Sequence, residues 1–200
     1  ENKKIKDYFE SVAQTYTNYS KKGFRKWLRR REELIIKQSI KTLPLGDVLE
    51  LGSGTGYYSR YIYKQGCNSF TCVDFSSEML KNLDIPDCVK INANIENFKS
   101  KNCFDTVFCA GALEFLERPE EVFNNVANML KPNGFFIILM PRYSFFGIIY
   151  QMFHQLHGFK IKLFKKNDLQ NWIHKANLDI VEYKTVSFFS IFLKLSPRKK

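Results

Sequence analysis

The residues with the clearest chemical potential are Glu50 and three glycines at positions 52, 54 and 56, which close the short apolar run Val48–Leu51. Glycine has no Cβ atom, so such a loop can turn sharply and let a ligand approach the main chain. The next segment reads as a helix, whose N-terminal amides would face the carboxyl end of the strand. Dinucleotide-binding loops are spaced G-x-G-x-x-G, whereas here Tyr57 occupies the third glycine position. The spacing predicts a ligand-binding turn and argues against a nicotinamide oxidoreductase; a glycine-rich turn without a ligand is the alternative.

A second carboxylate, Asp74, ends the next β-rich run, residues 69–73. A second parallel strand of this spacing would bring Asp74 beside the glycine loop. Its two oxygens can accept hydrogen bonds from two vicinal hydroxyls, as a ribose presents them. Ser76 or Ser77, with Glu78 close behind, predicts the start of a helix. We interpret Asp74 as a ribose ligand, and an exposed helix cap is the alternative.

Several motifs occur in one order over residues 46–141: the glycine loop, VDFSSEML at 73–80 and LKPNGFFII at 130–138. This series resembles the class I (Rossmann-like) S-adenosylmethionine-dependent methyltransferases, in particular the small-molecule and lipid methyltransferases of the domain 11 and 25 type. The resemblance implies S-adenosyl-L-methionine as cofactor and S-adenosyl-L-homocysteine as its product. It also implies an α/β three-layer sandwich with helices on both faces of a seven-stranded, mostly parallel sheet. The implied strand order is 3-2-1-4-5-7-6, with the last strand antiparallel.

The resemblance further assigns roles to single residues. It implies that Asn94 accepts a hydrogen bond from the exocyclic amine of adenine and that the Ile95 amide donates to the ring. Ile95 is a departure, because the family usually has alanine there, and Asn94 as a plain turn residue is the alternative. No metal ligand is expected. The cofactor-binding residues that the resemblance implies are Glu50, Gly52, Ser53, Gly54, Gly56, Asp74, Phe75, Met79, Asn94, Ile95 and Ala110.

The elements that must position these residues can be read from hydrophobic periodicity. Residues 104–110 predict a strand, and the spacing of apolar residues over 120–130 predicts a helix. Residues 131–134, Lys-Pro-Asn-Gly, predict a helix end and a turn. The continuous apolar run 135–140 then predicts a buried parallel strand.

Two helices are predicted before this core. Apolar residues repeat at helical spacing near the N-terminus: Ile5, Tyr8, Phe9, Val12 and Tyr16. This helix resembles the one that closes over the cofactor in small-molecule methyltransferases, with Tyr16 or Tyr19 lining the lid or packing in the core. A second helix, residues 24–40, is expected to keep its arginines on or near the outer face and to turn inward Trp27, Leu28, Leu34 and Ile35.

The segment 145–158 is apolar on nearly every side over about three turns, which a surface helix should not be unless it covers a pocket or touches lipid. We expect it to form a lid over the acceptor site; packing beneath the N-terminal helix is the alternative. Histidine titrates near neutral pH and can act as a general base. No obligatory catalytic residue can be named, and the candidates are His154, His157, Tyr143 and Glu114.

The whole chain is expected to form a single methyltransferase domain. It would consist of a helical lid (1–45), a cofactor-binding core (46–141), an acceptor-side insertion (142–166) and a closing helix and hairpin (167–196). The net charge of +11 is divided into +7 over residues 1–46, −4 over 47–140 and +8 over 141–200. The basic flanks would attract an anionic or phosphate-bearing acceptor or a membrane surface; a solvated lysine-rich surface is the alternative.

The composition leaves three functional classes open. The preferred one is an enzyme that methylates a small molecule or lipid. An RNA or other nucleic-acid methyltransferase is less favoured, because Cys109–Ala112 is not the Asp/Asn-Pro-Pro-Tyr/Phe run of amino-group base methylators. A non-catalytic S-adenosylmethionine-binding protein is the third. Five cysteines without C-x-x-C spacing predict reduced thiols and a cytoplasmic location, peripheral at a membrane surface as an alternative.

Overall fold

The computed structural model describes residues 2–19, 23–156, 158 and 161–199, with only the backbone described for residues 2, 15–19 and 23–25. Its centre is a seven-stranded sheet in the order β3-β2-β1-β4-β5-β7-β6. Strands β1 to β5 pair in parallel, and β7 pairs antiparallel with both of its neighbours. The predicted fold class is therefore confirmed. The strands are β1 Asp47–Leu51, β2 Ser69–Asp74, β3 Val89–Asn92, β4 Phe104–Ala110, β5 Leu130–Pro141, β6 Leu178–Thr185 and β7 Ser190–Pro197.

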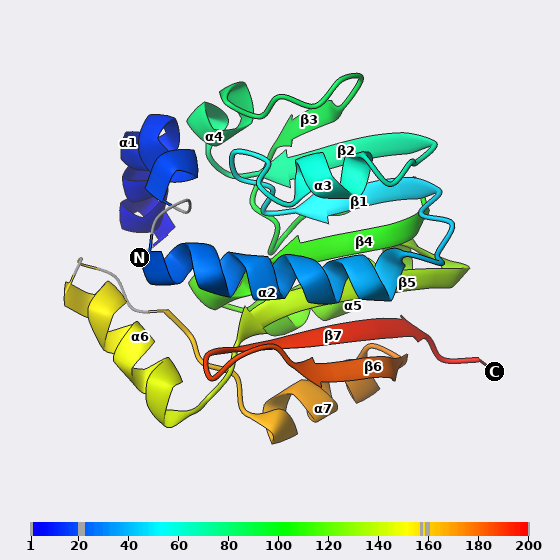
Figure 1. Cartoon of the computed structure of the whole chain (residues 1–200). Coiled ribbons are helices and arrows are strands. Elements are labelled where there is room, and N and C mark those ends of the chain that lie inside the picture. The colour runs from blue at the N-terminus through cyan, green and yellow to red at the C-terminus, as the bar shows by residue number, and fades with distance from the viewer. Residues whose placement is uncertain (1, 20–22, 157, 159–160, 200) are drawn as a thin grey trace.

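Helices cover both faces of the sheet, with α2 and α3 in front of it and α5 behind it in Figure 1. The helices are α1 Asn2–Tyr19, α2 Gly23–Ile40, α3 Ser59–Tyr63, α4 Ser77–Lys81, α5 Pro119–Met129, α6 Phe145–Leu156 and α7 Lys166–Lys175, with a 3₁₀ turn, η1, at Leu113–Phe115. The start of α4 agrees with the prediction, because the Ser76 side chain accepts a hydrogen bond from the Met79 amide.

The alternation of side chains along the strands builds two buried clusters, one on each face. Leu49 and Leu51 of β1 pack with α5 and α7, whereas Val48 packs with α2 and α3. The central strands are apolar on both sides, as the sequence of β5 predicted, because helices cover both of their faces. This packing fixes the carboxyl ends of β1, β2 and β4 along one edge of the sheet.

The order of the strands reverses between β1 and β4, which is where open α/β sheets form their ligand crevice. At the opposite end of the sheet, the Lys131 ammonium lies 2.8 Å from an Asp47 oxygen and 2.7 Å from an Asp105 oxygen. This pair of contacts joins β1, β4 and β5 away from the crevice. This edge of the sheet is therefore held in place from the opposite end, and α1 lies beside it (Figure 1).

Two sequence-based expectations were wrong in detail. The turn predicted at 131–134 lies within β5, where the pairing shifts from Phe104 with Leu130 to Thr106 with Phe135, so these residues form a bulge in the strand. In α2, Trp27 and Leu34 are exposed, at 42% and 56%.

The inward face of α2 is partly polar. It buries Glu32, Ile36 and Ile40, and Arg29 also turns inward, where its guanidinium contacts the Glu32 carboxylate and the Tyr58 hydroxyl. The Tyr58 hydroxyl donates to Glu32 at 2.6 Å. With Glu32 buried and Arg29 half-buried, the inner face of the helix differs from the one that apolar periodicity alone selects.

Candidate functional site

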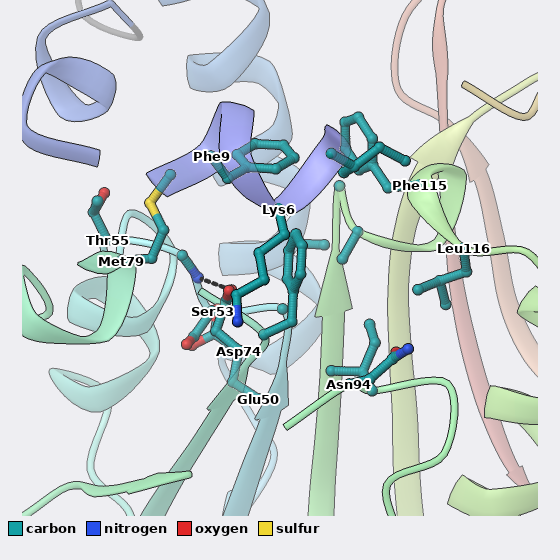
Figure 2. A pocket seen from close by; sticks show the side chains of 18 of the residues that line it. Lys6, Phe9, Glu50, Ser53, Thr55, Asp74, Met79, Asn94, Phe115 and Leu116 are labelled. Atoms are coloured by element: carbon teal, nitrogen blue, oxygen red, sulfur yellow. Dashed lines mark hydrogen bonds between the residues drawn. The ribbon is translucent and has the colours of Figure 1, made fainter. Parts of the chain in front are cut away.

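A cleft of 480 Å³ lies at the carboxyl edge of the sheet, at the switch point between β1 and β4. Its floor is formed by the ends of β1, β2 and β4, and helix α1 covers it from above (Figure 2). The volume and the concave shape are those of a small-molecule site. No helix that the structure describes has the length and apolarity to cross a bilayer.

The glycine loop lines one wall of this cleft. Gly52 and Gly54 have φ angles of +73° and +53°, which side-chain-bearing residues rarely adopt. A Cβ atom at position 52 would lie 2.3 Å from the Ala112 Cβ, so that position is closed by packing. At Gly54 a Cβ atom would meet no atom within 4 Å, because it would project into open space. The main chain at position 54 is therefore bare on the side where a ligand would lie.

Asp74 is held between the loop and the next helix. Its Oδ2 accepts from the Gly54 amide at 2.8 Å, and its Oδ1 accepts from the Ser76 amide at 2.9 Å. Burial raises the pKa of this carboxyl group, and the amides of Ser76, Gly54 and Phe75 oppose that shift. Each oxygen retains a second acceptor site for a ligand hydroxyl. The carboxylate thus both fixes the loop and faces the cleft.

Glu50 and Ser53 present buried polar atoms for which the described residues offer no hydrogen-bond partner. The Glu50 side chain is 2% exposed, and its Oε2 and the Ser53 Oγ have no partner. Burial raises the pKa of Glu50 to about 8. Such unpaired polar atoms are costly in a folded protein and call for a ligand group. A carboxyl group of this kind fits a cationic ligand, which would supply the missing charge and hydrogen bond.

Ten of the eleven predicted cofactor residues line the cleft: Glu50, Gly52, Ser53, Gly54, Asp74, Phe75, Met79, Asn94, Ile95 and Ala110. Gly56 does not, because it faces Leu83, whose Cγ would lie 3.3 Å from an added Cβ. Asn94 Oδ1 accepts from the Glu96 amide at 2.9 Å, so Asn94 is a turn residue as well as a wall residue. Its second lone pair is the one that a ligand amine could use.

The sequence reasoning missed the residues that roof the cleft. Phe9 of α1 lies edge-on to Phe75 and Phe115, with ring centroids 5.9 and 5.1 Å apart. Figure 2 shows Phe9 and Phe115 above the cleft, with Lys6 extending from α1 into it. The apolar periodicity of α1 singled out Phe9 but did not place it. No sequence pattern marked Phe115 as a cleft residue, apart from its position just after β4. The side chains of Tyr16 and Tyr19, and all of His157, lie outside the described residues.

A second cavity of 320 Å³ adjoins the first. The two share Phe9, Arg29, Gly111 and Phe115 in their linings. The second cavity is bounded by α2, the end of β5 and the inward face of α6. Its other lining residues include Glu32, Glu114, Tyr150, Phe153, His154 and Ser190.

Glu114 lines the second cavity, next to Gly111, which borders both cavities. The side chain is 4% exposed, and its Oε2 has no hydrogen-bond partner among the described residues. Burial raises its pKa to about 7, and the nearby Arg29 guanidinium opposes this shift. A carboxyl group that titrates near neutral pH at a cavity wall is suited to proton transfer.

Of the other catalytic candidates, His154 lies at a cavity and Tyr143 does not. His154 also lines the second cavity, with its ring 4.6 Å from that of Tyr150 and 6.1 Å from that of Phe115. Tyr143 lines neither cavity, because it is 52% exposed and its ring lies under the Lys165 ammonium. Within the described part of the chain, no three or more His, Cys, Asp or Glu side chains gather to hold a metal ion.

The strand order, the bare glycine loop and the carboxyl groups of Glu50 and Asp74 in the cleft are those of a Rossmann-like fold with a ligand crevice at its switch point. Residues 49–138 match the family model described as a methyltransferase domain. In fold, the chain is similar to magnesium protoporphyrin IX methyltransferase from Synechocystis PCC 6803 with bound S-adenosylhomocysteine. That match has a TM-score of 0.77 at 15% identity and covers 98% of this chain and 100% of the other.

Two curated relatives agree with this family. A malonyl-[acyl-carrier protein] O-methyltransferase of Ilyobacter polytropus is 26% identical over 138 residues, or 66% of this chain and 50% of the relative. A trans-aconitate 2-methyltransferase of Escherichia coli O45:K1 is 25% identical over 112 residues, or 54% of this chain and 44% of the relative. The chain thus spans about half the length of the curated relatives it matches. Residues 49–138 thus match a methyltransferase domain, and in sequence and fold the chain is similar to S-adenosylmethionine-dependent methyltransferases.

We expect Asp74→Ala to weaken binding of S-adenosylhomocysteine more than Asp74→Asn does. Alanine removes the acceptors for the cofactor hydroxyls and for the Gly54 and Ser76 amides, whereas asparagine keeps one carbonyl oxygen. The loss for alanine should be about 1.5–3 kcal/mol, the range for hydrogen bonds to a charged group. Titration calorimetry measures both variants. Unchanged affinity in Asp74→Ala would remove the ribose assignment.

Proposed function

We propose that this chain transfers a methyl group from S-adenosylmethionine to a small-molecule or lipid-like acceptor in the second cavity, with Glu114 as the general base. The observation that carries the proposal is the shared wall of the two cavities, with the Glu114 carboxyl group in the second cavity beside Gly111, which borders both. A cofactor in the first cavity and an acceptor in the second would lie on either side of these shared residues. The ten cleft residues described above would hold the cofactor.

The cofactor supplies an electrophilic methyl group when it is bound. The protein's own part is to orient the acceptor atom and to exclude water, which can lower a barrier by about 7–11 kcal/mol. The aromatic roof of Phe9, Phe75 and Phe115 covers the junction and limits access of solvent. Glu114 Oε2, which has no partner among the described residues, would accept the proton that a hydroxyl acceptor loses.

The charges around the second cavity favour an acceptor whose reacting end is neutral. Among the described residues that line the second cavity, Arg29 is the one lysine or arginine, and its guanidinium lies 3.5 Å from the Glu32 carboxylate. An anionic reacting group would therefore lie beside two carboxyl groups, Glu32 and Glu114, without an unpaired cation. If the acceptor carries a phosphate or carboxylate, that group fits better at the basic surface outside the cavity, near Lys162 and Lys165.

The names of the relatives agree with a small acceptor rather than a nucleic acid. They refer to malonyl-[acyl-carrier protein], trans-aconitate and magnesium protoporphyrin IX. Apolar and aromatic side chains such as Tyr150, Phe153 and Leu139 form much of the second cavity, which suits an acceptor with an apolar body.

The proposal is tested by incubating the protein with S-adenosylmethionine and separate pools of polar metabolites, extracted lipids and RNA. We expect S-adenosylhomocysteine to accumulate with the metabolite or lipid pool. Accumulation with RNA alone would make the chain a nucleic-acid methyltransferase. Binding of S-adenosylhomocysteine without turnover on any pool would make it a non-catalytic binding protein.

We expect Glu114→Gln to lower turnover about 100-fold or more, the lower end of general acid–base contributions. Binding of S-adenosylhomocysteine should change little, because glutamine has nearly the same size. The base must be ionised, so the wild-type rate should rise with pH and level off above about 7. The variant should lose this rise.

His154→Gln is the matched control for the base, since His154 lines the same cavity. It should keep the wild-type pH profile. If the rise of the rate with pH is lost in His154→Gln and kept in Glu114→Gln, His154 and not Glu114 is the general base.

A further inference from the structure

Helix α6 turns large apolar side chains toward solvent. Phe145, Met152 and Leu156 are 73%, 59% and 87% exposed, and no charged residue occurs in the helix. The apolar surface continues onto the β6–β7 loop, where Phe188 is 65% exposed and lies 5.2 Å from the Phe146 ring. We call this surface the α6 face. Its residues are Phe145, Phe146, Ile148, Ile149, Met152, Leu156 and Phe188.

The opposite side of α6 is already occupied within the chain. Gly147 is buried, and its added Cβ would lie 2.3 Å from the Arg142 carbonyl oxygen. The Gln151 amide donates to the Ile161 carbonyl at 2.5 Å, and Tyr150 and His154 line the second cavity. The helix is therefore fixed by its inward residues, and its outward apolar face is not needed for packing among the described residues.

Basic side chains lie close to the α6 face. Lys162, Lys165 and Lys166 are exposed, the Lys165 ammonium lies over the Tyr143 ring just before α6, and the segment 141–200 as a whole carries a net charge of +8. The first turns of α2 lie at the same end of the molecule as α6 (Figure 1), and there Lys26, Arg30 and Arg31 are exposed. An apolar surface within a basic rim is complementary to an anionic lipid bilayer, which offers an acyl region beneath negative headgroups.

We propose that the α6 face docks this protein on the surface of an anionic lipid bilayer. The helix would lie in the interface with Phe145, Ile149 and Met152 among the acyl chains, and the lysines and arginines would contact headgroup phosphates. The docking does not depend on the reaction. If the function proposed above holds, it also brings the second cavity, lined by the other side of α6, next to the membrane from which an amphiphilic acceptor would enter.

A second copy of the chain fits this face less well. A symmetric dimer through α6 would place the same patch on both subunits in contact. Each basic rim would then face another basic rim, and like charges across an interface reduce affinity. An anionic bilayer removes this repulsion and covers the same apolar area.

The test is co-sedimentation of the purified full chain with vesicles of phosphatidylcholine alone or mixed with phosphatidylglycerol. We expect the protein to pellet with the anionic vesicles and to be partly released by salt. The double variant Met152→Ser, Leu156→Ser should have an affinity for the anionic vesicles that is lower by about tenfold or more, because two inserted apolar side chains are lost. Lys165→Glu with Lys166→Glu should reduce binding to the anionic vesicles only.

The matched control is Val89→Ser with Val181→Ser, which removes two apolar side chains that are 56% and 50% exposed on β3 and β6, the two edges of the sheet. It should bind vesicles as the wild type does. Calorimetry with S-adenosylhomocysteine should give one affinity for all variants, which separates docking from the proposed reaction. The proposal is overturned if the folded wild type stays in the supernatant with anionic vesicles. It is also overturned if ultracentrifugation shows a dimer that only the α6 variant dissociates.

Discussion

Gly54→Val should lose binding of S-adenosylhomocysteine by about 100-fold or more, near the upper end of the cost of overpacking a close contact. An added Cβ at this position meets no protein atom within 4 Å, so its two methyl groups would occupy the volume of the cleft itself. The Gly54 amide also donates to Asp74, and a valine that shifted the loop would disturb that contact as well. Titration calorimetry on the folded variant measures the effect.

Gly66→Val is the matched control for backbone strain. Gly66 also has a positive φ, +88°, and open space around an added Cβ, but it lies in the turn after α3 and does not line the cleft. Both variants should lose stability to a similar degree, because a β-branched residue is strained at positive φ. Only Gly54→Val should lose the ligand. Equal affinities for the two variants would show that position 54 does not face the cofactor.

Glu50→Gln should weaken cofactor binding by about 1.5–3 kcal/mol, the range for a hydrogen bond to a charged group. The Glu50 Oε2 is buried and has no partner among the described residues, so a cationic group of the ligand is its natural complement. In the ligand-free protein burial holds the pKa at about 8, and a bound cation would lower it. Binding then releases a proton, and the wild-type affinity should rise as the pH increases from 6 toward 8.

The same substitution should make the ligand-free fold more stable. A carboxyl group whose pKa is raised in the folded state binds its proton more tightly there than in the unfolded chain. Its contribution to stability is therefore lost as the pH rises from about 4.5 through about 8. Glutamine does not ionise, so the excess melting temperature of Glu50→Gln over wild type should grow across this range. Thermal unfolding at several pH values measures this difference, and a constant difference would contradict the raised pKa.

The carboxyl edge of the sheet could be predicted from the sequence because its residues have few other roles. Glycines at alternate positions and an aspartate at the end of the next strand specify a turn and a carboxylate, and the strand order brings them together. The fold class and the strand order, which the resemblance to the class I methyltransferases implied, were also right. Gly56 was grouped with the ligand contacts by its spacing, although its environment, the Leu83 side chain, depends on a residue far along the chain.

The parts that could not be predicted depend on tertiary contacts between distant segments. Hydrophobic periodicity placed Trp27 and Leu34 inside, because it cannot foresee that Glu32 is buried against Tyr58, with the half-buried Arg29 beside it. Glu114 was one of four candidate bases. Its selection required its depth below the surface and the path of α6, neither of which is encoded in a local pattern.

The Phe9 ring has a consequence for the order in which the two molecules bind. Because this one side chain borders both cavities, we expect a bound nucleoside to hold the Phe9 ring in place and so to complete a wall of the second cavity. Steady-state kinetics should then show a compulsory sequence, with the sulfonium compound first and the acceptor second. A bisubstrate inhibitor that carries an adenosine moiety and an apolar tail, joined beneath this ring, would exploit the shared boundary.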